Sequence, residues 1–181
     1  MINKSEKNNR IRKMTHYLTR AGIVGALYAV ITLAIYPFAF GPLQIRISEA
    51  LTVLPFFMPE AVLGLFIGCI VSNFFSTNIV ILDVIFGSLA TLLAAILTYF
   101  CSKLGKNGKW LAPLPPVVIN AIVIALVIAL STTSAGEGSF YTVLLYNMAT
   151  VGVGQLIACY GLGIPLSFML EKIKNRFKIF Q

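Results

Sequence analysis

The chain has 181 residues, of which 58% are hydrophobic and only 11% are charged, and its mean hydropathy is +0.89. Soluble domains carry about a quarter charged residues, so this composition excludes an ordinary soluble domain and a receptor with a large folded exterior. The net charge of +8 is concentrated beside apolar runs, which is not the pattern of a nucleic-acid-binding protein. The sequence therefore predicts one membrane domain over residues 15–172, between a basic N-terminal segment (1–14) and a basic C-terminal tail (173–181).

Basic residues form three clusters. They are Lys4, Lys7, Arg10, Arg12, Lys13 and Arg20 near the N-terminus, Lys103, Lys106 and Lys109 in the interior, and Lys172, Lys174, Arg176 and Lys178 near the C-terminus. Because Lys and Arg are enriched in cytoplasmic loops of membrane proteins, we predict that all three clusters are cytoplasmic.

The predicted spans follow from the long apolar runs, which are 21–40, 79–101, 112–132 and 141–170. The interval 47–75 is 29 residues long, and as one helix it would extend roughly 44 Å. Counting it as one span would place the terminal basic clusters on opposite faces, whereas counting it as two places every cluster inside. Pro55 and Pro59 interrupt the run where two spans need a turn. We therefore predict an all-α integral membrane protein with six transmembrane helices, a short second span near 47–57 and both termini cytoplasmic.

The first apolar run carries small residues at a spacing of four. Ala21, Gly25 and Ala29 form one stripe, and Gly22 and Ala26 form the next. Such residues let helix backbones approach closely. Two interpretations remain open, namely packing within the chain and docking of another membrane subunit.

The inventory of reactive residues argues against an enzyme. The only histidine is His16 and the only aspartate is Asp83, so zinc-protease, Ser–His and paired-aspartate sites cannot be built. The chain also lacks a GxxxxGK[ST] loop, which places any ATP hydrolysis in another subunit. Cys69, Cys101 and Cys159 have no metal-ligand or CxxC spacing. We expect no metal and no cofactor.

Polar residues at membrane depth are functional candidates because they are costly there. The predicted topology brings five of them to the outer third of the membrane, and these are Glu49, Asn73, Asp83, Tyr146 and Asn147. Gln155 lies two turns deeper, and Arg46 is three residues from Glu49, close enough for an ion pair. Asn120 is interpreted as an interhelical hydrogen bond. Carboxylates favour cations or planar donor edges, and tyrosines offer stacking faces, so the pattern predicts a small, flat, donor-rich or cationic solute.

Three segments make a more specific comparison possible. Residues 41–55 read GPLQIRISEALTVLP, residues 59–73 read PEAVLGLFIGCIVSN, and residues 83–95 read DVIFGSLATLLAA. This pattern resembles QueT-type membrane proteins, which are substrate-binding S components of energy-coupling-factor (ECF) transporters associated with queuosine-precursor uptake. The resemblance covers about residues 15–172.

The resemblance implies a six-helix S component in the plasma membrane that binds solute from outside. Such proteins dock on a transmembrane T component driven by two ABC ATPases, with small residues of the first helix at the contact. The corresponding residues here are Ala21, Gly22, Gly25, Ala26 and Ala29. The implied solute is a 7-deazaguanine such as 7-aminomethyl-7-deazaguanine.

Within this framework Glu49 or Asp83 would accept hydrogen bonds from the guanine-like edge, and the other would face the ammonium group. Arg46 would orient a carboxylate or meet the ring carbonyl, and Tyr146 with Asn147 would form the opposite wall. The full predicted substrate-binding set is Gln44, Arg46, Glu49, Asn73, Asp83, Tyr146, Asn147 and Gln155.

Three alternatives remain at this stage. One is a stand-alone secondary transporter of a small flat cationic solute, which would need inverted repeats and coupling acids at the midplane. Another is an S component for a different vitamin. The last is a structural membrane protein without a solute.

Overall fold

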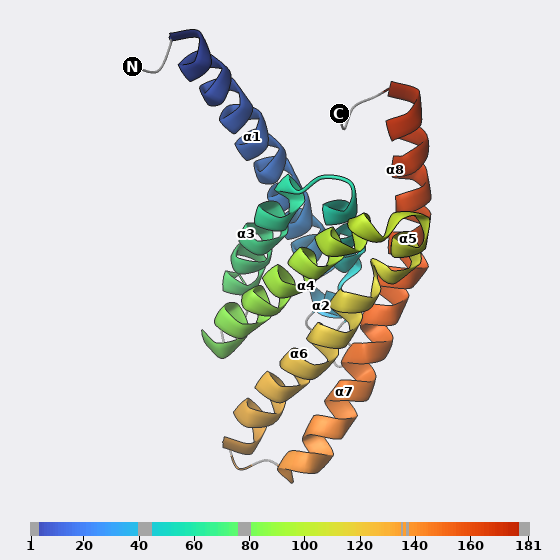
Figure 1. Ribbon diagram of the computed structural model, residues 1–181. Coiled ribbons are helices and arrows are strands. Elements are labelled where there is room, and N and C mark those ends of the chain that lie inside the picture. Colours follow the sequence, from blue (N-terminus) through green and yellow to red (C-terminus); the bar gives the residue numbers. More distant parts are fainter. Residues whose placement is uncertain (1–3, 40–44, 76–80, 135, 137, 178–181) are drawn as a thin grey trace.

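The computed structural model describes residues 4–39, 45–75, 81–134, 136 and 138–177, and every regular element in these ranges is helical (Figure 1). In chain order the elements are α1 (Lys4–Ala34), α2 (Tyr36–Ala39), η1 (Ile47–Phe56), α3 (Glu60–Phe74), η2 (Asp83–Gly87), α4 (Ser88–Cys101), η3 (Ser102–Asn107), α5 (Gly108–Leu111), α6 (Leu114–Ser134), α7 (Phe140–Leu156), η4 (Ile157–Leu162) and α8 (Gly163–Phe177). The predicted all-α class is confirmed.

Within the described ranges, four continuous helical stretches are long and apolar enough to cross a membrane. They are Lys4–Ala34, Asp83–Gly105, Gly108–Ser134 and Phe140–Arg176. The interrupted run of the sequence folds as two shorter apolar helices, η1 and α3. The ten residues of η1 form a 3₁₀ helix, which extends about 20 Å at the rise of that helix. The 15 residues of α3 extend about 22 Å, so both are shorter than the roughly 30 Å hydrocarbon core.

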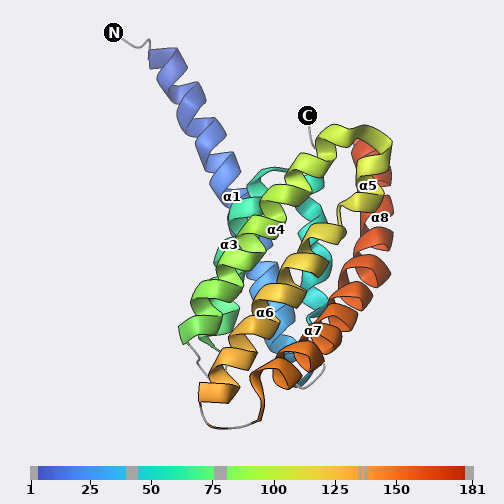
Figure 2. The same cartoon turned by 60° about the horizontal axis from the view of Figure 1, so that its bottom comes forward.

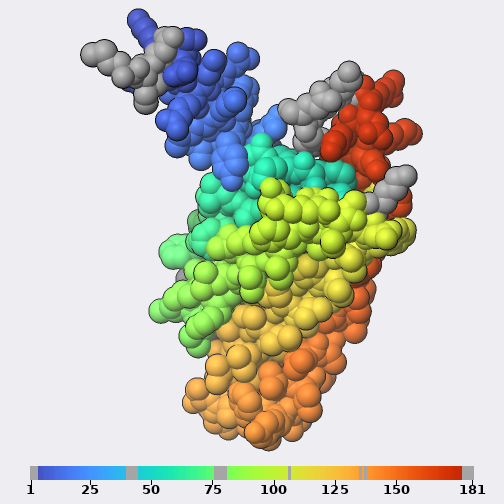
Figure 3. Space-filling view, viewed as in Figure 1, coloured from blue at the N-terminus to red at the C-terminus, as the bar shows by residue number. Residues whose placement is uncertain are grey.

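The first and the last residues that the structure describes, in α1 and α8, lie at one end of the molecule (Figure 1). The first turns of α1 and the last turns of α8 project from the body at this end, apart from each other, and the end of α6 and the start of α7 lie at the opposite end (Figures 1 and 3). Figure 2 shows α6 and α7 side by side along their length. Near the α1–α8 end, Lys109 Nζ of α5 lies 2.5 Å from Glu171 Oε2 of α8.

Helices α1 and α3 pack through small residues. A Cβ atom added at Gly64 would lie 2.5 Å from the carbonyl oxygen of Ala21, and one added at Gly68 would lie 2.6 Å from that of Gly25. Only glycine fits at such distances, because a larger residue would push the backbones apart. The stripe Ala21, Gly25 and Ala29 is buried within the chain.

The neighbouring stripe of α1 has a different environment. Gly22 and Ala26 are exposed, and a Cβ added at Gly22 would meet nothing within 4 Å. The five predicted docking residues therefore lie on two faces, one packed inside the chain and one open. The docking role itself stays a prediction.

We expect Gly64→Ala and Gly68→Ala each to lower the thermal unfolding midpoint in detergent. Overpacking of a close contact costs typically about 1–3 kcal/mol, and here the added methyl would meet backbone. The matched control is Gly22→Ala, whose methyl has free space. Equal midpoints for all three variants would contradict the close α1–α3 packing.

Candidate functional site

The centre of the described bundle holds polar side chains that are almost completely buried. Glu49 is 0% exposed and Arg46 is 5% exposed. Other buried polar residues include Thr32, Ser48, Thr52, Ser72, Asn73, Thr91, Asn120 and Gln155. Charges inside a membrane domain are costly and mark functional sites by default. This buried group is therefore the candidate site.

Both carboxylate oxygens of Glu49 are bonded to side chains from other helices. The Tyr28 hydroxyl of α1 donates to Oε1 at 2.5 Å, and Nδ2 of Asn120, on α6, donates to Oε2 at 3.3 Å. These bonds tie η1 to two long helices. They also provide the hydrogen bonds that a buried carboxylate requires.

The 3₁₀ geometry of η1 aligns Arg46, Glu49 and Thr52 along one side, whereas the buried Ser48 contacts Thr32 of α1. A 3₁₀ helix has three residues per turn, so Glu49 and Thr52 share a face, and Arg46 precedes them at the same spacing. Thr52 Oγ1 donates to the Glu49 carbonyl at 2.6 Å. The guanidinium of Arg46 interacts electrostatically with both Glu49 and Asp83. Runs of 3₁₀ helix this long are uncommon, and this one carries the charged residues of the site.

A second part of the site joins the end of α3 to the start of η2. Asn73 Nδ2 donates to the backbone carbonyl of Asp83 at 3.2 Å and to Cys69 Sγ at 3.5 Å. Asp83 begins η2, a π-helical turn, and such turns are frequent at functional sites. A Cβ added at Gly87 would lie 3.1 Å from Asn73 Nδ2 and 3.7 Å from Asp83 Oδ1. Glycine at position 87 therefore leaves room for the amide.

Three oxygens of this site have no hydrogen-bond partner among the described residues. They are Asn73 Oδ1, Asp83 Oδ1 and Asn120 Oδ1, and each is buried. Buried polar atoms nearly always have a partner, because an unpaired one costs free energy. Unpaired acceptors that come from three helices suit a ligand with several N–H donors.

The structure brings together four of the predicted site residues, which are Arg46, Glu49, Asn73 and Asp83. Gln155 joins through Cys159, whose thiol lies 3.4 Å from Gln155 Oε1 and 3.6 Å from the Glu49 carbonyl. Gln44 lies outside the described residues.

The two residues predicted from α7 are placed differently. Tyr146 is 62% exposed. Asn147 is partly buried, and its Nδ2 donates to the Val143 carbonyl of its own helix at 2.7 Å. The aromatic ring that contacts the acid in this structure is Tyr28. A wall formed by Tyr146 and Asn147 stays a prediction.

Sequence reasoning missed Tyr28 and did not count Asn120 among the binding residues. The prediction of an interhelical hydrogen bond for Asn120 is confirmed by its bond to Glu49. Tyr28 follows Gly25 by three residues and precedes Ala29, so the small-residue stripe already placed it on the packed face of its helix. That helical spacing was the signal available for finding it.

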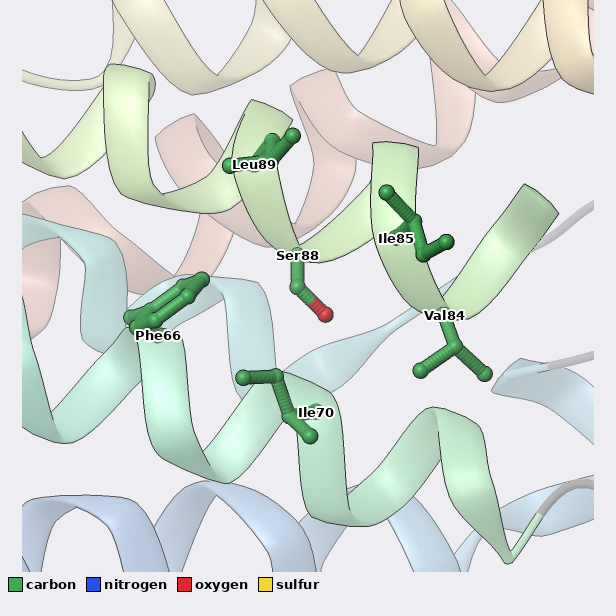
Figure 4. Close-up of a pocket in the computed structure, with 6 residues that line it drawn as sticks. All are labelled: Phe66, Ile70, Val84, Ile85, Ser88 and Leu89. Carbon is green, nitrogen blue, oxygen red and sulfur yellow. The ribbon is translucent and has the colours of Figure 1, made fainter. Parts of the chain in front are cut away.

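A separate groove opens between α3 and the η2–α4 segment (Figure 4). It is lined by Phe66, Ile70, Val84, Ile85, Ser88 and Leu89 and has a volume of about 250 Å³. Among these lining side chains, Ser88 supplies the only polar atom. A flat, donor-rich solute needs several acceptors, so we place the candidate site at the buried polar group and not in the groove.

Comparison with known proteins shows similarity to QueT transporters. The family model described as QueT transporter matches residues 18–172. The chain is 37% identical over 83 residues to the Queuosine precursor transporter QueT of Lactococcus lactis subsp. cremoris (strain MG1363). The aligned part covers 45% of this chain and 48% of that protein, about half of its length. No solved structure gives a significant match.

Loss of the Tyr28 hydroxyl should destabilise the protein. Tyr28→Phe leaves Oε1 of the fully buried Glu49 without its short hydrogen bond, and an unsatisfied buried acceptor costs about 1–3 kcal/mol. Thermal unfolding in detergent would show a lower midpoint for this variant. Tyr141→Phe, at a residue that is 73% exposed, is the matched control. Equal midpoints for both variants would show that the Tyr28–Glu49 bond contributes nothing.

Proposed function

Because the chain belongs to the QueT transporter family, we propose that it is the high-affinity S subunit of an ECF-type importer for a queuosine precursor. The observation that carries the proposal is the buried polar site, which combines two carboxylates with unpaired amide oxygens. The name of the Lactococcus lactis relative supports the substrate class. The proposed substrate is a 7-deazaguanine such as 7-aminomethyl-7-deazaguanine.

The chemistry of that substrate suits the site. A 7-deazaguanine is planar, and its pyrimidine edge presents a ring N–H and an amino group that can donate to carboxylate and amide oxygens. The aminomethyl group adds a positive charge. Glu49 and Asp83 are the acidic side chains of this site, and a carboxyl group that accepts hydrogen bonds from an ammonium group favours a cationic ligand.

The proposed topology has six membrane crossings, with both termini in the cytoplasm. The four long apolar stretches and the shorter η1 and α3 supply the crossings. The basic first turns of α1 and last turns of α8 share one end of the molecule, as the positive-inside rule requires of a cytoplasmic face (Figure 1). In this topology the last turn of α3, with Asn73, and the start of η2, with Asp83, would lie on the outer side, where the substrate would enter.

The proposed partners are a transmembrane T component and two ABC ATPases. The chain has no nucleotide-binding loop of its own, so another subunit would couple ATP hydrolysis to transport. The exposed residues Gly22 and Ala26 offer a flat surface on α1 where another helix could approach closely.

The decisive experiment is calorimetric binding to the detergent-purified chain without ATP. The panel contains 7-aminomethyl-7-deazaguanine, 7-cyano-7-deazaguanine, queuine, guanine, thiamine, riboflavin and biotin. We expect tight one-site binding of one deazaguanine. Glu49→Gln and Asp83→Asn should each weaken it by about tenfold or more, because a hydrogen bond to a charged group contributes about 1.5–3 kcal/mol.

Glu171→Gln is the control for that experiment, since Glu171 is half-exposed and its carboxylate pairs with Lys109, which is not a residue of the site. Unchanged affinity in both site variants would refute the assignment of the two acids. No binding to any solute by a folded chain would refute the proposed substrate. Uptake by the chain alone, driven by an ion gradient in proteoliposomes, would instead identify a secondary transporter.

The proposed docking surface can be tested apart from substrate binding. Gly22→Leu combined with Ala26→Leu should reduce co-purification with the T component, because bulky side chains would hold the two helices apart. Substrate affinity should stay unchanged, since both positions are exposed. Ala149→Leu, at an exposed small residue of α7, is the control. Full co-purification of the double variant would exclude this face of α1 as the contact.

A further inference from the structure

We infer that Glu49 is a positioning residue, and that the substrate is read by three other oxygens, which belong to Asn73, Asp83 and Asn120. This inference rests on the proposed function and assigns separate roles within the same site. The two acids then have different roles. Glu49 orients the amide of Asn120, and Asp83 contacts the substrate. The ligand class it defines is a planar solute with several N–H donors on one edge.

The first step is that both oxygens of Glu49 already accept a hydrogen bond from another helix. A carboxylate only accepts hydrogen bonds, and each oxygen of Glu49 already has a donor, from Tyr28 and from Asn120. The residue is 0% exposed. Because the side chain is fully enclosed, a substrate could reach this carboxylate only if the side chains around it moved. Its existing hydrogen bonds indicate that Glu49 orients the side chains of Tyr28 and Asn120.

The second step concerns the orientation of the Asn120 amide. Its Nδ2 faces Oε2 of Glu49, and the reverse orientation would place two acceptor oxygens against each other. Glu49 therefore fixes which end of the amide faces away from it. That end is Oδ1, which is buried and has no partner among the described residues.

Asn73 is oriented by the same principle. Its Nδ2 donates to the Asp83 carbonyl, which can only accept. The outer end of this amide is again Oδ1, buried and unpaired within the described part of the chain. The amides of Asn73 and Asn120 therefore each have an unpaired oxygen. The orientation of each amide is fixed by the acceptor that its nitrogen bonds.

The third step places these oxygens around one turn. Asn73 and Asp83 both lie close to Gly87 of η2, and a Cβ at Gly87 would also lie 3.4 Å from Ile124 Cδ1 of α6. Asn120 is one turn before Ile124 on the same face of α6. Gly87 therefore lies next to the side chains of Asn73 and Asp83 and next to the residue of α6 that is one helical turn after Asn120. Acceptor oxygens from three sides select a donor edge and reject acceptor-rich or anionic solutes.

The ligand side of the inference is tested with two compounds that differ by one amino group, 7-deazaguanine and 7-deazahypoxanthine. Wild-type protein should bind the second compound at least about tenfold more weakly, because a buried acceptor then loses its donor. This ratio should fall below about threefold in at least one of Asn73→Leu, Asp83→Asn and Asn120→Leu. Thr133→Val is the control, because its hydroxyl bonds only to the Ala129 carbonyl of the same helix in the described structure.

The positioning role is tested with a double-mutant cycle. Glu49→Gln should weaken binding of 7-deazaguanine about tenfold in the wild-type background, because the new amide can donate to Asn120 and turn its oxygen inward. In the Asn120→Leu background the same change should cost less than about threefold. Additive losses would show that Glu49 contacts the substrate directly and would overturn its positioning role.

The outcomes separate the inference from the proposed function. Tight binding of 7-deazaguanine with an unchanged ratio in all three oxygen variants would overturn the inference and leave the proposed function intact. No binding of either compound by folded wild-type protein would overturn both. The wild-type ratio needs no variant to fold, so a ratio near one would by itself refute recognition of the amino group.

Discussion

A carboxylate sealed inside a membrane protein is the constraint from which much of this structure follows. Removing a charge from water costs several kcal/mol unless hydrogen bonds and opposite charge compensate it. Glu49 meets this requirement with donors from α1 and α6 and with the nearby charge of Arg46. The acid therefore fixes the relative positions of three segments that are distant in sequence.

The irregular features of the backbone serve the same arrangement. In the 3₁₀ helix η1, with three residues per turn, Glu49 and Thr52 are directly aligned, whereas residues three apart on a regular α-helix are offset by about 60°. The glycine contacts of α3 bring α1 close enough for Tyr28 to be completely buried beside η1. The π turn of η2 sets Asp83 beside Asn73. The 3₁₀ helix η1 and the π turn η2 each carry an acidic side chain of the site.

The sequence predicted the helical class, the four long apolar stretches and the division of the interrupted run at Pro59, because hydropathy and proline act locally; Pro55, by contrast, lies inside η1. It also selected Arg46, Glu49, Asn73 and Asp83, since charged and amide groups are rare at membrane depth. It could not identify Tyr28 as the partner of Glu49, because that contact depends on how closely α1 approaches η1. Tyr146 was predicted to line the site, but its side chain is 62% exposed. An aromatic residue near the end of a span can face outward as well as inward, and the sequence does not distinguish the two. Gln44 lies outside the described residues, so its predicted role is still open.

The division between acceptors that are already bonded and acceptors that are unpaired has a consequence for transport. Tyr28 and Asn120 satisfy Glu49 without a substrate, whereas Asn73, Asp83 and Asn120 retain buried oxygens that only a donor can satisfy. On the proposed function, the substrate supplies those bonds and so stabilises the bound state, which favours tight capture from dilute solution. Release then requires the same bonds to be broken in a place that water does not reach. On the proposed function, an ATP-driven partner subunit would supply the work that breaks these bonds.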